Sequence, residues 1–383
     1  MSFRPVSIEI TQTITKKDKQ DNGIFFTPKE DRDILLGVLD SLGLYPTSIL
    51  EPSFGSGEFL EDLYERYPNA AITGVEKNAE LFGSTVRPNV YNMDFLEYSG
   101  KHDMIVGNPP YFVIPKSSGT LKCQKGRPNM FVQFLYKSVT ENLTSDGHLG
   151  FILPTSFYNA TYYEPMRRHI FENTTVIAVS PLSGKYIDTQ QSTFCLVLQN
   201  GKRNDDFMVE INGSVYLTPD KSRIVELMQG SSTLKSIGFK VSTGDVVWNQ
   251  VKESLVDSGG TLLIYSGNIR NGVLCLNEQM KEEKKQYIQG FAKEPISGVS
   301  ILLNRGYGNA AYILNPVIVN FEKYHAENHV NVIRPETPEA KKFIGRVYDS
   351  LCNEKTAEFI SLFVGNNALS KTEIESCLPI WLA

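Results

Sequence analysis

Hydrophobic residues in the N-terminal half of the chain follow two alternating patterns. Over residues 29–43 they recur at helical spacing, which predicts an amphipathic helix. Short runs rich in β-branched and aromatic residues, which predict strands, lie at 48–51, 71–75, 90–91, 103–106, 149–153, 176–179 and 193–198. Further helical patterns cover 58–67, 129–143 and 162–172. Alternation of strands and helices favours a mostly parallel sheet with helices on both faces, so we expect an α/β fold.

This pattern changes after about residue 200. Residues 201–214 (GKRNDDFMVEINGS) predict a polar connector and a hairpin, and the remainder mixes short irregular strands with two helices near 336–350 and 353–364. The residues before the first helix are polar and lysine-rich, so we expect a loosely held arm there. The predicted parts are an N-terminal arm over 1–22, a first domain over 23–205 and a smaller mixed α+β domain over 206–383.

Composition places the chain among folded globular proteins. Of its 383 residues, 41% are hydrophobic and 21% are charged. No apolar run approaches the roughly 20 residues of a membrane-spanning helix, and the N-terminus lacks the apolar stretch of a signal peptide. The five cysteines are an odd number at irregular spacing, which argues against a disulfide framework, and they form no CxxC pair, which argues against a thiolate zinc site. We therefore expect a cytoplasmic protein.

The distribution of charge matters more than its sum. A formal net charge of −5 counts mildly against a nucleic-acid ligand, but net charge says little about local fields. No acidic residue lies between Met104 and Thr140. The basic residues of this stretch that we expect to contact phosphates are Lys116, Lys122, Lys125 and Arg127.

A turn with two glycines follows the first predicted strand. It reads Glu-Pro-Ser-Phe-Gly-Ser-Gly over residues 51–57, and such a turn lets backbone N–H groups approach a ligand where a helix begins. The third glycine of a dinucleotide-binding turn is missing, because position 60 is Leu. This departure favours S-adenosylmethionine (SAM) over nicotinamide or flavin cofactors. The residues of the turn expected to bind SAM are Glu51, Ser53, Gly55 and Gly57.

Acidic residues end the next two predicted strands. Glu76 ends the second strand, where a carboxylate can accept hydrogen bonds from ribose hydroxyls. Asp94 ends the third, where it can accept from an adenine amine, and Phe95 beside it can stack on the adenine ring. Ligands of open α/β sheets bind at the carboxyl ends of the strands. We therefore expect all three residues to bind the cofactor.

The fourth predicted strand runs into Asn108-Pro109-Pro110-Tyr111. The two prolines fix φ and remove two N–H donors, so the turn is rigid and its first carbonyls are free to accept. A conjugated amine such as adenine N6 is a poor nucleophile, and two acceptors on its N–H bonds would draw it toward a tetrahedral form. The Asn108 side-chain oxygen and the Pro109 carbonyl can supply these acceptors, and Tyr111 offers a face on which a base can stack. Methyl transfer from SAM then needs positioning and electrostatics rather than a metal.

Taken together, these motifs resemble the γ-group of N6-adenine DNA methyltransferases, and in particular the TCGA-type modification enzymes of restriction–modification systems. The resemblance implies a Rossmann-like seven-stranded SAM-dependent methyltransferase domain, followed by a domain that binds duplex DNA while the target adenine rotates out of the helix. It assigns a SAM contact to Thr27 in Phe25-Phe-Thr-Pro28, and a second aromatic against the base to Tyr186. Arg305, in a glycine-flanked segment of the second domain, is the expected DNA contact there.

Other acceptors remain open at this point. Loops of this kind also occur in enzymes that methylate a glutamine amide of release factors or an amine of ribosomal RNA, since these groups share a conjugated NH2. A non-catalytic DNA-binding subunit is a third class. A long region after the methyltransferase motifs favours DNA adenine. We expect any cognate restriction endonuclease to be a separate protein, and the enzyme to be a monomer.

Overall fold

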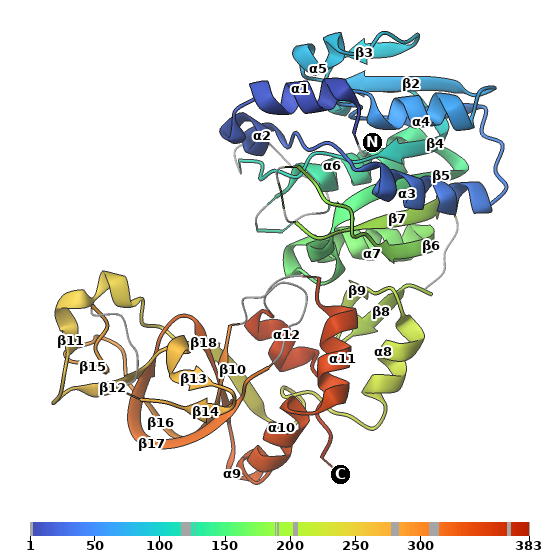
Figure 1. The fold of residues 1–383 in the computed structure, drawn as a ribbon. Helices are drawn as coiled ribbons and strands as arrows, with labels where there is room; N and C mark the ends of the chain where they lie inside the picture. Colours follow the sequence, from blue (N-terminus) through green and yellow to red (C-terminus); the bar gives the residue numbers. More distant parts are fainter. Residues whose placement is uncertain are drawn as a thin grey trace. The chain divides into compact units, whose positions relative to one another are not determined.

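The computed structural model describes residues 3–115, 123, 125–126, 128–187, 189, 191–201, 206–276, 283–305, 314–365 and 369–382. The chain divides into two compact units, Met1–Lys221 and Ser222–Ala383, and Figure 1 shows the ribbon of both. The sequence placed the boundary between residues 205 and 206. The predicted hairpin forms from β8 (Met208–Ile211) and β9 (Ser214–Leu217), and it belongs to the first unit.

The first unit is built on a seven-stranded sheet with the order β3-β2-β1-β4-β5-β7-β6. Its first five strands are parallel, and β7 lies antiparallel between β5 and β6. This arrangement confirms the predicted Rossmann-like α/β fold. The strands are β1 (Ser48–Glu51), β2 (Ala71–Glu76), β3 (Val90–Asn92), β4 (His102–Gly107), β5 (Leu143–Pro154), β6 (Thr174–Pro181) and β7 (Thr193–Asn200).

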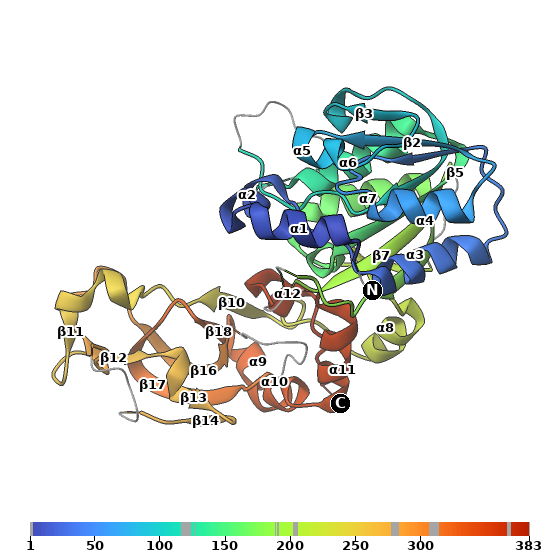
Figure 2. The ribbon, with the colours of Figure 1, turned by 45° about the horizontal axis from the view of Figure 1, so that its top comes forward.

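Helices cover both faces of this sheet (Figure 2). One face packs against α3 (Lys29–Ser41) and α4 (Glu58–Arg66), and the other against α6 (Met130–Lys137) and α7 (Glu164–Asn173). Successive side chains of a strand point to opposite faces, so β4 contributes Met104 and Val106 to one apolar cluster and Ile105 to the other. Strand order reverses between β1 and β4, and ligands of such sheets bind beside the carboxyl ends of the strands at that point.

The N-terminal segment is folded, so the expectation of a loosely held arm was wrong. It forms α1 (Pro5–Thr13) and α2 (Lys16–Asn22). Ser7 is completely buried, and its Oγ lies 2.7 Å from the Oγ of Ser56 in the glycine turn. The backbone N–H of Arg4 donates to the Glu58 carboxylate over 3.0 Å. These contacts, rather than the polar composition of the segment, determine its conformation.

The second unit contains its own seven-stranded sheet, with the order β10-β18-β16-β17-β12-β15-β11. The expectation of short irregular strands was wrong for its centre, where β16 has 9 residues and β17 has 10. The strands are β10 (Phe239–Thr243), β11 (Leu255–Val256), β12 (Thr261–Ile264), β15 (Tyr287–Ile288), β16 (Ile296–Asn304), β17 (Val317–Ala326) and β18 (Val330–Pro335), with a separate pair β13 (Ile269–Arg270) and β14 (Val273–Leu274).

Helices complete both units. Those not yet named are α5 (Ala79–Gly83), α8 (Lys221–Met228), α9 (Pro338–Lys341), α10 (Ile344–Leu351), α11 (Glu354–Phe363) and α12 (Lys371–Ser376). The pattern near 336–350 is divided between α9 and α10, and the pattern over 353–364 forms α11, as predicted. No helix in the described ranges is both long and apolar enough to span a membrane.

Candidate active site

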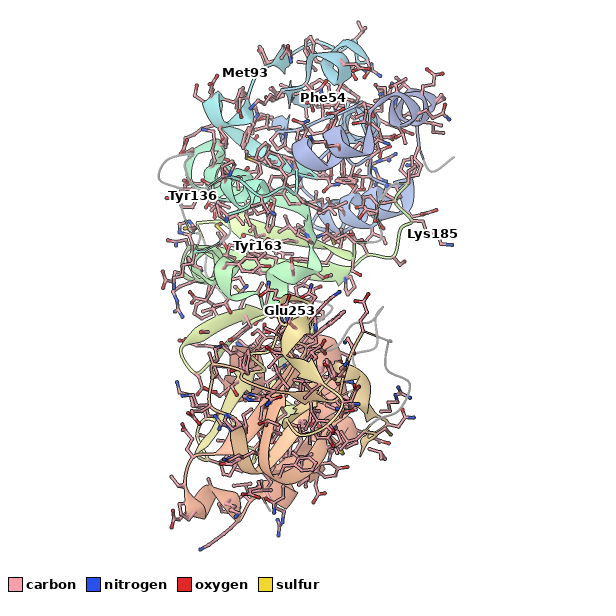
Figure 3. The ribbon with its side chains drawn as sticks, turned by 90° about the vertical axis from the view of Figure 1, so that its left-hand side faces the viewer. Phe54, Met93, Tyr136, Tyr163, Lys185 and Glu253 are labelled. Carbon is pink, nitrogen blue, oxygen red and sulfur yellow. The ribbon has the colours of Figure 1, made fainter. Side chains whose placement is uncertain are left out.

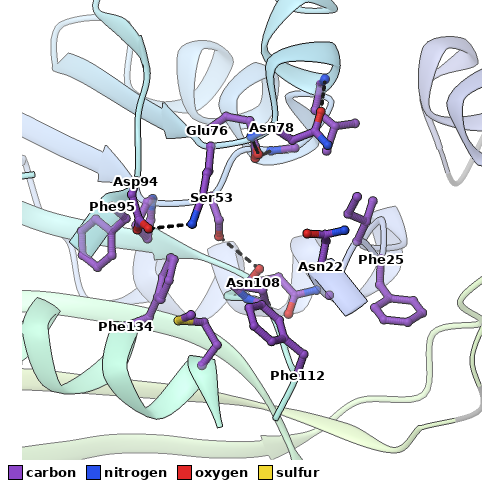
Figure 4. Close-up of a pocket in the computed structure, with 18 of the residues that line it drawn as sticks. Asn22, Phe25, Ser53, Glu76, Asn78, Asp94, Phe95, Asn108, Phe112 and Phe134 are labelled. Atoms are coloured by element: carbon purple, nitrogen blue, oxygen red, sulfur yellow. Dashed lines mark hydrogen bonds and ion pairs between the residues drawn. The ribbon is translucent and has the colours of Figure 1, made fainter. Parts of the chain in front are cut away.

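A cavity of about 330 Å³ lies in the first unit at the carboxyl ends of β1 to β4. Figure 4 shows side chains from separate loops converging on it. The residues that line it are Asn22, Gly23, Ile24, Phe25, Phe26, Pro52, Ser53, Gly55, Glu76, Lys77, Asn78, Leu81, Asp94, Phe95, Asn108, Pro110, Phe112, Met130 and Phe134. The cavity therefore sits where the strand order reverses, which is the position the topology predicts for a ligand.

The glycine turn forms one wall. Gly55 and Gly57 adopt φ values of +57° and +85°, in the left-handed region that favours glycine. A Cβ at Gly57 would lie 2.8 Å from Nη1 of Arg4 and 2.9 Å from Oγ1 of Thr85, so these two side chains would have to shift to accommodate it. The Oγ of Ser53 donates to the backbone carbonyl of Asn108 over 3.3 Å, which joins this wall to the Asn-Pro-Pro-Tyr loop (Figure 4).

Two carboxylates face the cavity in fixed orientations. Glu76 accepts from the backbone N–H of Gly55 at 2.9 Å and from that of Asn78 at 2.7 Å. Burial nevertheless raises the pKa of Glu76 above its ordinary value, although these donors oppose the rise. Asp94 accepts from the Leu96 N–H at 2.9 Å, and its other oxygen pairs with Nζ of Lys77 at 2.9 Å. Lys77 is mostly exposed, so a ligand amine can replace it at Asp94.

Glu51 lies at the end of β1 and is 2% exposed. Among the described residues, its Oε2 has no hydrogen-bond partner. Burial raises the pKa of Glu51 well above its usual range, and only the charge of Arg32 among its principal neighbours opposes the rise. Arg32 itself is committed to two other buried acids, Glu58 at 2.9 Å and Asp62 at 2.6 Å. Glu51 is thus a buried acid with one unpartnered oxygen among the described residues, and its chain neighbour Pro52 lines the cavity.

The side chain of Asn108 is held by two neighbours. Its Nδ2 donates to Oγ1 of Thr27 over 3.0 Å, and the hydroxyl of Tyr111 donates to its Oδ1. The same hydroxyl lies 2.7 Å from the carbonyl of Ile152, so its single proton is shared between two acceptors. The ring of Tyr111 meets Phe131 edge-on, with centroids 5.8 Å apart. Asn108 is therefore oriented before any acceptor arrives, and Oδ1 keeps a second lone pair.

Comparison with known proteins identifies the family. The profile of the Eco57I restriction-modification methylase family matches residues 57–186. The modification methylase CviBIII of Paramecium bursaria Chlorella virus NC1A is 30% identical over 99% of both chains. The chain belongs to the restriction-modification methyltransferases. The type II methyltransferase M.CvrRI of Paramecium bursaria Chlorella virus XZ-6E is 29% identical, again over 99% of both chains. A type I restriction-modification methyltransferase subunit from Streptococcus thermophilus has a TM-score of 0.41 at 18% identity, covering 52% of this chain and 51% of that chain.

In this methyltransferase some of the predicted site residues line the cavity, and others lie outside its lining. Those that line the cavity are Ser53, Gly55, Glu76, Asp94, Phe95 and Asn108, with Pro110 of the catalytic motif. Of the other predicted residues, Thr27, Glu51, Gly57, Pro109 and Tyr111 are absent from the lining that the structure describes. Thr27 instead supports Asn108 from behind. Phe95 is nearly fully buried and packs on Phe134 at 4.7 Å between centroids, so only part of its ring faces the cavity.

The predicted DNA contacts lie elsewhere or outside the described residues. Lys116, Lys122 and Arg127 lie outside them. The Lys125 side chain is 70% exposed and lies 3.9 Å from Glu164 of α7. Arg305 follows β16 in the second unit, where its backbone N–H donates to the His329 carbonyl. Of the two that the structure describes, neither Lys125 nor Arg305 is among the residues that line the cavity.

Sequence reasoning missed several residues that line the cavity. Residues 22–26 form one wall, and Asn78, Phe112, Met130 and Phe134 complete others. The motif Phe25-Phe-Thr-Pro28 was the available signal: the contact was assigned to Thr27, whereas Phe25 and Phe26 are the residues of this motif that line the cavity. The other four come from helices and loops that only the fold brings to this position.

The residues present fit SAM. A cavity of this size suits a small molecule, and its acidic residues match the positive charge of a sulfonium and an ammonium group. Glu76 and Asp94 face the cavity, and Glu51 has a buried acceptor with no partner in the described part of the chain. When bound, SAM supplies a methyl group already activated by its positive sulfur. The protein then has to orient an acceptor and exclude water.

Proposed function

We propose that this protein transfers the methyl group of SAM to N6 of an adenine rotated out of duplex DNA. The observation that carries the proposal is the position of Asn108, which lines the cofactor cavity and is held from behind by Thr27 and Tyr111. A preoriented amide at this wall can accept from an NH2 group and direct its lone pair toward the cavity. The amine nitrogen loses its proton to solvent once the new N–C bond has formed.

The other residues of the loop have separate roles in this proposal. The Pro109 carbonyl is the second acceptor for the amine. Tyr111 and Tyr186 hold the two faces of the base. The Tyr111 hydroxyl now donates toward Asn108 and Ile152, so its ring moves, or the base enters beside it, when DNA binds. Extruding a base costs roughly a few kcal/mol, which stacking against these rings can offset.

DNA is favoured over RNA or protein as the acceptor by the names of the relatives and by the second unit. The relatives that match the whole chain are named a modification methylase and a type II methyltransferase. Residues 206–383 are proposed as the target-recognition region, with Arg305 as a DNA contact. We also propose that the enzyme acts as a monomer and that any partner endonuclease is a separate chain.

A product analysis tests the function. The purified protein is incubated with methyl-labelled SAM and either unmethylated duplex DNA, RNA or a release factor, and the products are digested and separated. We expect label in N6-methyladenine from DNA alone. Label in glutamine, in an RNA base or in cytosine would refute the proposal. Asn108→Ala is expected to lower transfer by about 100-fold or more, as when a preorganised donor or acceptor is removed, while SAM binding survives.

A further inference from the structure

A long-range contact joins the start of α3 to the loop that carries Tyr186. Asp31, in the first turn of α3, is completely buried, and its Oδ1 accepts a hydrogen bond from the backbone N–H of Gly184 at 2.9 Å. A Cβ built on Gly184 would lie 2.5 Å from the same oxygen, so only glycine allows this approach. The loop over 182–187 is therefore pressed directly against the carboxylate of Asp31.

Two further polar atoms belong to this contact. Within the described part of the chain, Asp31 Oδ2 and the Tyr186 hydroxyl are both buried without a hydrogen bond of normal geometry. Burial raises the pKa of Tyr186, its neighbour Thr193 opposes the rise, and the nearby Asp31 carboxylate adds to it. Lys185, in contrast, projects away from the sheet (Figure 3). The loop thus turns Tyr186 inward, toward the acid.

The same cluster reaches the catalytic loop. Burial raises the pKa of Tyr111 well above its usual value, and the neighbouring Tyr186 hydroxyl and Asp31 carboxylate raise it further. The Tyr111 hydroxyl donates to Asn108, whose amide donates to Thr27 at 3.0 Å. Thr27 directly precedes Pro28, the N-cap residue of α3, which begins at Lys29. The start of α3 therefore reaches Tyr111 through Thr27 and Asn108, and it reaches the loop of Tyr186 through Asp31.

We propose that Asp31 is a positioning residue for the target base: it anchors the 182–187 loop to α3 and so fixes Tyr186 beside Tyr111. This assignment rests on the proposed function, because it is the base clamp that gives the anchor its purpose. When the loop closes on a base, the Tyr186 hydroxyl donates to Asp31 Oδ2 and both buried atoms become paired. Residues at the start of α3 then hold both sides of the site: Thr27 holds Asn108, which lines the cofactor cavity, and Asp31 holds the loop that carries Tyr186.

Two variants of Asp31 separate the effect of its hydrogen bond to Gly184 from the effect of its negative charge. Asp31→Ala removes both acceptors, whereas Asp31→Asn keeps an oxygen that can accept from the Gly184 N–H. We measure hydrogen exchange of residues 182–187 in the free protein, the Kd of SAM, and kcat and KM for DNA. Base positioning is followed by the fluorescence of 2-aminopurine at the target position, once methylome sequencing with the wild type has given the recognition sequence.

For Asp31→Ala we expect faster exchange in the loop, unchanged SAM affinity, weaker 2-aminopurine enhancement, and a fall in kcat/KM for DNA of up to about 100-fold, the order expected when a reacting group is displaced by an ångström. Asp31→Asn should restore most of each property. Gly184→Ala should lower kcat/KM for DNA strongly when it is made in the wild type. The same substitution should have little further effect when it is made in the Asp31→Ala variant, because the clash requires the Asp31 carboxylate.

Unchanged loop exchange and unchanged DNA kinetics in Asp31→Ala would overturn the assignment. So would an equal loss of SAM affinity and DNA turnover, which would indicate a general structural role. Failure of the proposed function is distinguishable, since it would appear in the wild type as a product other than N6-methyladenine. In that case faster loop exchange in Asp31→Ala would still establish the anchor, and only its purpose would change.

Discussion

Glu51 offers a test in which stability and cofactor binding should move in opposite directions. The perturbation is Glu51→Gln, which keeps the volume of a side chain that is 2% exposed and removes its charge. In the free protein, Oε2 of Glu51 is buried with no partner among the described residues. An unsatisfied buried polar group costs about 1–3 kcal/mol, and more when it is charged. We therefore expect the neutral variant to be more stable than the wild type near neutral pH.

The size and the pH dependence of this effect can be stated. For a unit of this length, a gain of about 1–3 kcal/mol corresponds to a rise in Tm of roughly 2–12 °C. Burial raises the pKa of Glu51 above the ordinary 4.5, so the folded state holds the proton more tightly than the unfolded chain. The wild type then loses stability as pH rises from that value through the raised pKa. The advantage of Gln should be greatest at about pH 8 and shrink toward about pH 5.

Cofactor binding should respond in the other direction. Loss of a charged acceptor costs about 1.5–3 kcal/mol, which corresponds to roughly 10-fold to 150-fold weaker SAM binding in isothermal titration calorimetry. Asp62→Asn is the matched control, because Asp62 is also buried but pairs with Arg32 at 2.6 Å. It should lower Tm. If Glu51→Gln lowers Tm at about pH 8 as much as the control does, the interpretation of Glu51 as an uncompensated buried charge is incorrect.

Three shorter predictions concern the surroundings of the cavity. Arg32→Met removes the guanidinium that pairs with the buried carboxylates of Glu58 and Asp62 and should lower the free energy of unfolding by about 3–5 kcal/mol, measured by urea denaturation; a change below about 1 kcal/mol would contradict the buried network. Gly23 has φ +65° and a Cβ there would lie 2.8 Å from Cβ of Pro110, whereas Gly43 has φ +63° and open space. Gly23→Ala should therefore reduce methyl transfer, and Gly43→Ala should leave it unchanged; equal activities would exclude the contact with the catalytic loop. The logarithm of the DNA association constant should fall linearly with the logarithm of the salt concentration, and Lys125→Ala should reduce the size of that slope by about 1. An unchanged slope would show that Lys125 makes no phosphate contact.

The strand positions could be predicted from the sequence because a sheet buried on both faces leaves continuous apolar runs. Ile49 and Leu50 of β1 and residues 104–106 of β4 are completely buried, and each run stands out from its polar neighbours. The site motifs could be predicted because they directly follow these strands. Residues that follow parallel strands lie at the carboxyl edge of the sheet, so the positions of Glu76, Asp94 and Asn108 at this edge could be predicted from their places in the sequence.

What could not be predicted depends on contacts between distant segments. Helix α1 has only 9 residues, and isolated helices of that length are marginal in water. It is held by Ser7 and Arg4 against the glycine turn, which no local pattern reveals. Likewise, Asp31 and Gly184 are 153 positions apart. Each residue alone resembles an ordinary helix-start acid or loop glycine.

The start of α3 shows how these distant contacts combine. Thr27 directly precedes the N-cap of α3, and Asp31 and Arg32 lie in the first turn of this helix. Thr27 accepts from Asn108 of the proposed catalytic loop, Asp31 accepts from the 182–187 loop, and Arg32 pairs with Glu58 and Asp62 of α4. A displacement of this short segment would therefore disturb the catalytic loop, the proposed base clamp and the cofactor turn together. The rigidity that methyl transfer requires is thus supplied from one side of the cavity, by residues that hardly touch it.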